Sequence, residues 1–170
     1  MGKPLMEDAF AHHVWATLGL VDACLALNPE QLATTVPGTY GSILDTLRHC
    51  IGSDGWDLFV ATGDRATVIE EADMQLPELR AAMATHGPAW SRLLAQDPDP
   101  DAVLNEVDEE DGYERNVAMG IQLAGALQHG TDHRSQVCTV LTSLGVQPPK
   151  IDALDFGMQE GRVVEITPAS

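Results

Sequence analysis

Apolar residues recur along this chain at spacings of three and four residues, which is the period of an amphipathic helix. Four long stretches show the pattern: about Leu5–Leu27, a stretch after Ser42 that fades at residues 61–64, about Leu76–Ala95, and residues 117–144. Loops rich in proline, glycine and threonine separate the stretches. Four such segments predict a single all-α domain, residues 1–170, folded as an antiparallel four-helix bundle.

The ends of these segments carry recognisable helix signals. Asn28 and the proline after it end the first segment and can cap a short turn at residues 30–32. Ser42 suits the N-cap of the second helix, and Asp45 stands three residues later, where a capping-box partner belongs. Inside the third segment, Gly87 followed by Pro88 predicts a kink or a break.

A short acidic excursion at about residues 99–116 precedes the last long helix. Nine acidic residues fall between Asp97 and Glu114, which predicts a solvated segment and not a core strand. Residues 102–104 and the stretch from Tyr113 can pair as a short hairpin around a turn at Asp111-Gly112. A short amphipathic helix is expected in the tail, from Ile151 to Gln159.

The spacing of Asp97, Asp99 and Asp101 imitates the start of a calcium-binding loop. Ala102 occupies the position where an EF-hand needs glycine, and the intervening prolines stiffen the chain. The sequence therefore disfavours a calcium site there.

Composition excludes several classes of function. The 170 residues are 44% hydrophobic, enough for a folded core, and the net charge is −17. A field of that sign repels nucleic-acid backbones and anionic membrane surfaces, so neither is an expected partner. The three lone cysteines form no CxxC pair, and the N-terminus lacks an apolar signal segment. Both features favour a cytoplasmic protein.

Candidate chemistry centres on the last long helix. His129 and His133 stand four residues apart and therefore share one helix face, so two imidazoles can point at one cation. They belong to a polar line on an otherwise apolar helix, made of Gln122, Ala126, His129, His133 and Gln136. Buried polar groups need partners or a ligand. A zincin protease is excluded because glycine stands at position 130, where its glutamate belongs.

His49 in the second helix is the candidate for a third ligand, which would fix a metal while leaving positions open. The alternative is a core histidine satisfied by a backbone carbonyl or a glutamine. Asp45, one turn earlier, either orients an imidazole or serves only as the helix cap, and the cap is favoured. The remaining histidines are weaker candidates: one of His12 and His13 can line a pocket mouth, and His86 belongs to the expected helix break.

One histidine in LRHCIGSDGW and the pair in HGTDHRSQ, with a helical N-terminal segment and an excursion before the final helix, resemble the DinB-like family of metal-binding proteins. The resemblance extends from about Phe10 to Gly145. It implies a four-helix bundle with a three-histidine divalent site, usually nickel or zinc, in which His49, His129 and His133 are the ligands and coordination stays open. It also implies a homodimer paired through bundle helices.

Two classes of function follow from this resemblance. Some relatives use the metal to activate a low-molecular-weight thiol, as S-transferases and maleylpyruvate isomerases do, and many have no known reaction. The chain is therefore expected to be a metal-dependent enzyme acting on a small molecule through a thiol or water. The alternatives are a metal-dependent hydrolase and a non-enzymatic metal-binding or stress-response bundle, with Asp45 or, less suitably, Cys50 as a fourth ligand. Gln122, Gln136 and Arg134 are weaker candidates for substrate contacts, and Arg134 can instead lie outside, paired with Asp132 or with the acidic excursion.

Overall fold

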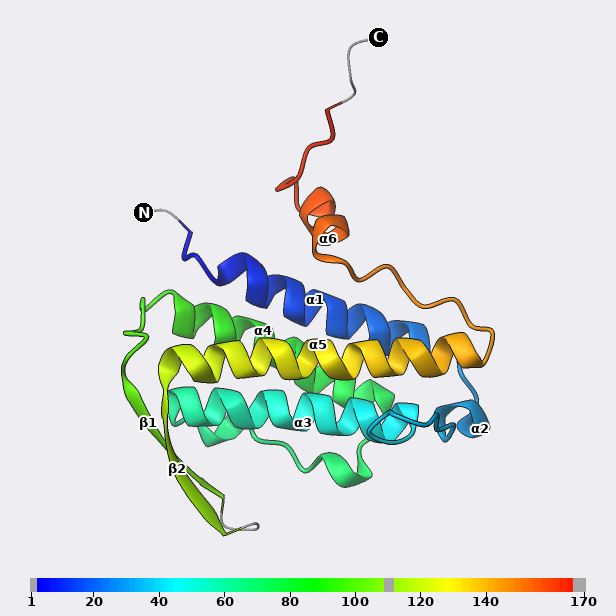
Figure 1. Ribbon diagram of the computed structural model, residues 1–170, viewed down its shortest axis with the longest axis horizontal. Helices are drawn as coiled ribbons and strands as arrows, with labels where there is room; N and C mark the ends of the chain where they lie inside the picture. Colours follow the sequence, from blue (N-terminus) through cyan, green and yellow to red (C-terminus); the bar gives the residue numbers. More distant parts are fainter. Residues whose placement is uncertain (1–2, 109–111, 167–170) are drawn as a thin grey trace.

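The computed structural model describes residues 3–108 and 112–166, and its fold is mainly helical, as the sequence predicts (Figure 1). The four long helices are α1 (Glu7–Cys24), α3 (Ile43–Thr62), α4 (Leu76–Leu94) and α5 (Met119–Ser143). Shorter elements connect or follow them: α2 (Pro29–Leu32), two 3-10 turns, η1 (Arg65–Thr67) and η2 (Glu71–Asp73), and α6 (Ala153–Gln159). All four long helices lie within the segments that the apolar periodicity predicts.

The long helices pack side by side, with α5 against α3 and α1 against α4 as the most extensive pairs (Figure 1). Helices α1 and α5 run in one direction, and α3 and α4 run in the other. The α1–α4 and α3–α5 pairs are therefore antiparallel, whereas α3 and α4 are parallel. Residues 63–75, which contain η1 and η2, make this possible because they return along the length of α3 before α4 begins (Figure 1).

The predicted caps at Asn28 and Ser42 are confirmed, although α1 ends at Cys24, before Asn28. The Ser42 hydroxyl accepts a hydrogen bond from the Asp45 backbone amide at 3.1 Å and donates to the Asp45 carboxylate at 2.6 Å. Asn28 forms a capping box with Gln31 at the start of α2. Gly63 ends α3 in the left-handed region, at φ 74°, where glycine has no steric penalty.

Of the kink or break predicted at Gly87-Pro88, the break is wrong, because α4 continues through both residues, and the kink stays a prediction. A proline inside a helix removes one backbone hydrogen bond. Buried side chains on either side, Met83 and Trp90, hold this stretch against the other helices. Gly87 permits close packing, since a Cβ there would lie 3.3 Å from the Val14 side chain of α1.

An antiparallel hairpin of β1 (Val103–Asp108) and β2 (Tyr113–Ala118) corrects the all-α expectation and confirms the predicted hairpin (Figure 1). Asp111, on which the predicted turn falls, lies outside the described residues. One side chain ties this excursion to the helices. The buried carboxylate of Glu106 accepts hydrogen bonds from Trp56 Nε1 at 2.9 Å, from the Tyr113 hydroxyl at 3.1 Å and from Arg115.

The interior has two apolar clusters with a polar layer between them. One cluster contains Leu20, Leu47, Leu79 and Leu141, and the other contains Phe10, Leu58, Trp90 and Leu123. The buried polar residues between the clusters are His13, Thr17, Asp54, His86 and Arg134. Cys24 and Cys50 are buried, and burial raises the pKa of each thiol to about 12, so both act as small apolar residues.

Candidate metal centre

The polar line on α5 faces α3 and the loop before it, and each of its long side chains meets a partner there. Gln122 Nε2 donates to Asp57 Oδ1 at 2.7 Å. Gln136 Oε1 accepts from the Tyr40 backbone amide at 2.7 Å. Between these two glutamines, His129 and His133 meet His49 of α3. The polar line is therefore a continuous contact between two helices.

The three histidines point their Nε2 atoms at one another. His129 Nε2 lies 3.1 Å from His49 Nε2 and 3.0 Å from His133 Nε2, and the ligand atoms of all three lie within 4.8 Å of one another. His133 is buried, and the other two are half-buried. Within residues 3–108 and 112–166, this is the one group of three or more histidine, cysteine or acidic side chains close enough to share an ion.

Proton counting shows that hydrogen bonding alone does not satisfy this arrangement. A neutral imidazole has one N–H donor and one acceptor nitrogen. His129 Nε2 faces two other Nε2 atoms, and a single proton can serve only one of those contacts. Two nitrogens that are each about 2.1 Å from one ion lie roughly 3.0–3.4 Å apart at ordinary coordination angles. The observed His49–His129 and His129–His133 spacings therefore fit imidazoles that share one cation.

Electrostatics keeps these imidazoles neutral, the form in which they bind metals. Burial, followed by the neighbouring His133 and His49, lowers the pKa of His129 to about 4. Burial also lowers the pKa values of His49 and His133. The three nitrogens can therefore present lone pairs at neutral pH without first losing protons.

Tyr40 covers one side of the group. Its ring stacks on the His49 ring, with centroids 4.1 Å apart and planes 7° apart, and meets the His133 ring edge-on. The hydrogen bond from its backbone amide to Gln136 anchors the loop in this position. Since 57% of the Tyr40 surface is exposed, this ring forms an outer wall of the site. Sequence reasoning missed Tyr40, because nothing in its local pattern marks it.

The structure also shows where the other candidate site residues of the sequence lie. Asp45 serves the helix cap, as favoured, and Cys50 lies in the core apart from the three histidines. Asp97, Asp99 and Asp101 form no shared ion site within the described chain. The exterior position considered for Arg134 is wrong, because Arg134 is 4% exposed and lies between α5 and α1.

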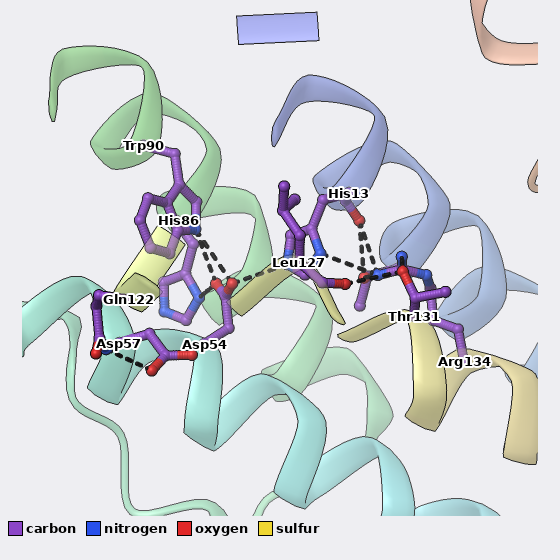
Figure 2. A network of polar contacts seen from close by, with 10 residues as sticks. His13, Asp54, Asp57, His86, Trp90, Gln122, Leu127, Thr131 and Arg134 are labelled. Atoms are coloured by element: carbon purple, nitrogen blue, oxygen red, sulfur yellow. Dashed lines mark hydrogen bonds and ion pairs between the residues drawn. The ribbon is translucent and has the colours of Figure 1, made fainter. Parts of the chain in front are cut away.

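A buried network centred on Asp54 of α3 was not predicted as a unit (Figure 2). Its carboxylate accepts from His13 Nε2 at 2.8 Å, from His86 Nδ1 at 2.7 Å and from Trp90 Nε1 at 3.1 Å. His13 Nδ1 in turn accepts from Arg134 Nη1 at 3.1 Å. The expected role of His86 at a helix break is therefore wrong, since it binds this carboxylate.

The pKa values of Asp54 and Asp57 are shifted in opposite directions, although both residues lie on α3. Burial pushes the pKa of Asp54 up, but hydrogen bonds from His13 and His86 outweigh burial and hold it well below the ordinary value. For Asp57, burial and the charges of Asp54 and Glu106 raise the pKa to about 7. The interior therefore holds a fixed carboxylate beside one that titrates near neutrality.

The family model described as the DinB family matches residues 1–163, nearly the whole chain and all three histidines of the candidate centre. No curated protein is similar enough to count as a match. No helix in the described part of the chain is long and apolar enough to cross a membrane.

Proposed function

The chain belongs to the DinB family, and on that basis we propose that His49, His129 and His133 bind one divalent metal ion in a four-helix bundle. The convergence of three Nε2 atoms, with spacings of 3.0 and 3.1 Å, carries the proposal. Nickel and zinc are the ions that we propose, since imidazole nitrogen suits both.

The metal would serve an enzyme that activates a low-molecular-weight thiol, or water, for attack on a small electrophile. An ion held by three neutral imidazoles keeps its full positive charge and lowers the pKa of a thiol or water that binds to it. S-transfer and thiol-dependent isomerisation are the favoured reaction types, and hydrolysis is the alternative use of the same centre.

The donor set supports an open site over a closed structural one. Closed zinc sites usually have four protein ligands. Among the described residues, no fourth histidine, cysteine or acidic side chain joins the three histidines. Asp45, the best candidate for that role, is held by Ser42 in the helix cap. The half-buried positions of His49 and His129 leave one side of the group near solvent.

The surrounding residues would position whatever enters. Tyr40 stacks on His49 and forms the wall next to the loop, where Gln136 anchors the backbone. Farther along the same face of α5, Gln122 and Asp57 form a hydrogen-bonded pair. A substrate that reaches the metal from the solvent side would meet the aromatic ring of Tyr40 beside His49.

Cobalt substitution tests the thiol proposal. The cobalt-loaded protein is titrated with L-cysteine and with glutathione, and serine is the oxygen-containing control. We expect a thiolate-to-metal charge-transfer band with at least one thiol and none with serine. The His49→Ala variant should give no band. Protein that holds cobalt but gives no band and no turnover with electrophilic acceptors would contradict thiol activation.

We also propose a cytoplasmic location and no nucleic-acid partner. Cys24, Cys50 and Cys138 are all free, which suits a reducing compartment. The net charge of −17 opposes binding to a phosphate backbone.

A further inference from the structure

A cavity of about 420 Å³ lies between α1, α5 and α6, apart from the three histidines. Its volume falls in the range of small-molecule sites. Apolar and aromatic side chains form much of its wall, including Ala9, Leu127, Phe156 and Val163. Its polar lining consists of Arg134 and Thr131 of α5, Asp8, His12 and His13 of α1, and Arg162 after α6. The cavity is thus largely apolar, with cationic and hydrogen-bonding groups at defined places.

Arg134 is the distinctive group of this cavity. A guanidinium has five N–H donors. Nη1 donates to His13 Nδ1 and to Thr17 Oγ1, both at 3.1 Å, and Nη2 donates to Thr131 Oγ1 at 3.0 Å (Figure 2). Nε–H and the second N–H of Nη2 have no acceptor among the residues that the structure describes. A cation that is 4% exposed therefore keeps donors for a ligand.

The charge of Arg134 is only indirectly balanced. No carboxylate contacts the guanidinium within the described chain, and the nearest link to one passes through the His13 ring to Asp54. Burial accordingly lowers the pKa of Arg134, although an arginine stays protonated at all ordinary pH values. Arg162, the other arginine of the cavity, pairs with Asp8 at 2.8 Å. Arg134 is thus the cation that a carboxylate would neutralise.

We infer that this cavity is a second binding site, for a small monocarboxylate with a compact apolar body, whose carboxylate would bind Arg134. Charge-assisted hydrogen bonds from a guanidinium to a carboxylate are strong and directional. The apolar wall of the cavity would pack against the apolar body of the ligand. A single available arginine and a mostly apolar lining favour a monocarboxylate over phosphate, which needs more donors.

The cavity and the candidate metal centre use different faces of α5. Adjacent residues on a helix point about 100° apart. His129 and His133 face α3, whereas Leu127, Thr131 and Arg134 line the cavity next to α1. The inference therefore goes beyond the proposed metal function and does not depend on it.

Calorimetric titration tests the site with two matched probes, phenylacetate and the neutral phenylacetamide. The carboxylate should bind about tenfold or more tightly than the amide, because only the carboxylate gains the charged hydrogen bonds. Inorganic phosphate at equal ionic strength should not compete. Equal affinity for both probes, no binding of phenylacetate, or competition by phosphate would overturn the inference.

Three variants locate the binding. Arg134→Met should weaken phenylacetate binding at least tenfold, whereas Arg92→Met, which removes an exposed arginine from α4, should leave it unchanged. Because Arg134 also makes buried hydrogen bonds, the affinity of Arg134→Met is interpreted only if this variant unfolds cooperatively. Ala9→Phe fills the cavity from the half-buried wall of α1 without touching the network, and it should abolish binding. Unchanged affinity in Ala9→Phe would overturn the inference.

The His49→Ala variant separates this site from the candidate metal centre. It should bind phenylacetate as the unmodified chain does, with or without a chelator. Loss of binding in that variant would mean that the carboxylate had bound to a metal and would overturn the cavity assignment. Metal-free protein that still binds phenylacetate would leave this inference intact even if the proposed metal function failed.

Discussion

At the scale of single residues, the buried polar side chains lead to the most specific predictions about stability. Asp54 accepts hydrogen bonds from three donors on α1 and α4, so its removal would leave buried donors unsatisfied. We expect Asp54→Asn to lower the free energy of unfolding by about 3 kcal/mol at pH 7. Urea denaturation followed by circular dichroism measures the change.

The pH dependence of this effect has a definite sign. The folded-state pKa of Asp54 lies below its unfolded value, which is about 3.9. The stability that Asp54 contributes is therefore present above that value and is lost as the pH falls below it. The difference in the free energy of unfolding between Asp54→Asn and the unmodified chain should therefore become smaller under acid conditions. A difference in the free energy of unfolding that grows as the pH falls would contradict the assignment of Asp54 as a fixed charge.

The contribution of Asp57 to stability should depend on pH with the opposite sign. Its folded-state pKa is raised to about 7, so its contribution to stability is lost as the pH rises through that value. An asparagine there keeps an oxygen acceptor for Gln122 and carries no charge. We expect Asp57→Asn to raise the free energy of unfolding by more than about 1 kcal/mol at pH 8 and by less than about 1 kcal/mol at pH 4, near the unfolded pKa. Equal effects at both pH values would refute the raised pKa.

These residues also show what sequence reasoning could have found. Asp54 occupies the apolar stripe of α3, in line with Leu47, Ile51 and Leu58 at helical spacing. His13 lies in a similar way on α1, between Phe10 and Leu20. An ionisable side chain on a core stripe is a detectable signal for a buried network. Its partners were not detectable, because they depend on which helices become neighbours.

At the scale of helices, Gly130 determines how closely α1 approaches α5. A Cβ at this position would lie 2.3 Å from the His13 ring and 2.9 Å from Arg134 Nη1, which is too close. We expect Gly130→Ala to lower the free energy of unfolding by about 1–3 kcal/mol, although alanine normally favours a helix.

Gly125 on the same helix provides the matched control, because nothing lies within 4 Å of the Cβ position there. Gly125→Ala should leave stability unchanged or raise it by up to about 1 kcal/mol. Thermal unfolding of the two variants under identical conditions makes the comparison. A Gly130→Ala variant as stable as Gly125→Ala would contradict the close approach of His13.

Helix boundaries were more predictable than helix arrangement. Local chemistry sets the caps at Asn28 and Ser42, so their positions follow from the sequence. Helix α4 continues through Pro88 without the break that the sequence allowed, because tertiary packing outweighs the loss of one hydrogen bond. The parallel pairing of α3 and α4 depends on the return of residues 63–75, for which periodicity gives no signal.

At the scale of the whole molecule, the homodimer expected from the family resemblance stays a prediction. Trp15 of α1 is not available for such an interface, since it packs against Phe156 of α6 with centroids 5.4 Å apart. Exposed apolar side chains remain elsewhere, including Leu25 at 46% and Ile121 at 66%. We expect light scattering at micromolar concentration to give twice the chain mass of 18.2 kDa. A mass of one chain would contradict the dimer.

The three histidines were found by pattern and resemblance, since two share a helix face and the third matches the family motif. Their mutual geometry was not predictable, because it depends on the register of α3 against α5. That register places three Nε2 atoms around one point, and the proposed metal centre depends on this convergence.

Elemental analysis of the purified, untagged protein is the decisive test of the three-histidine centre. We expect about one nickel or zinc ion per chain, sharply reduced in His49→Ala, His129→Ala and His133→Ala. His12→Ala should keep full metal content, because His12 bonds the Ile151 carbonyl on another face of the molecule. Full metal occupancy in His49→Ala, or none in the unmodified protein after incubation with nickel and zinc, would contradict the three-histidine centre.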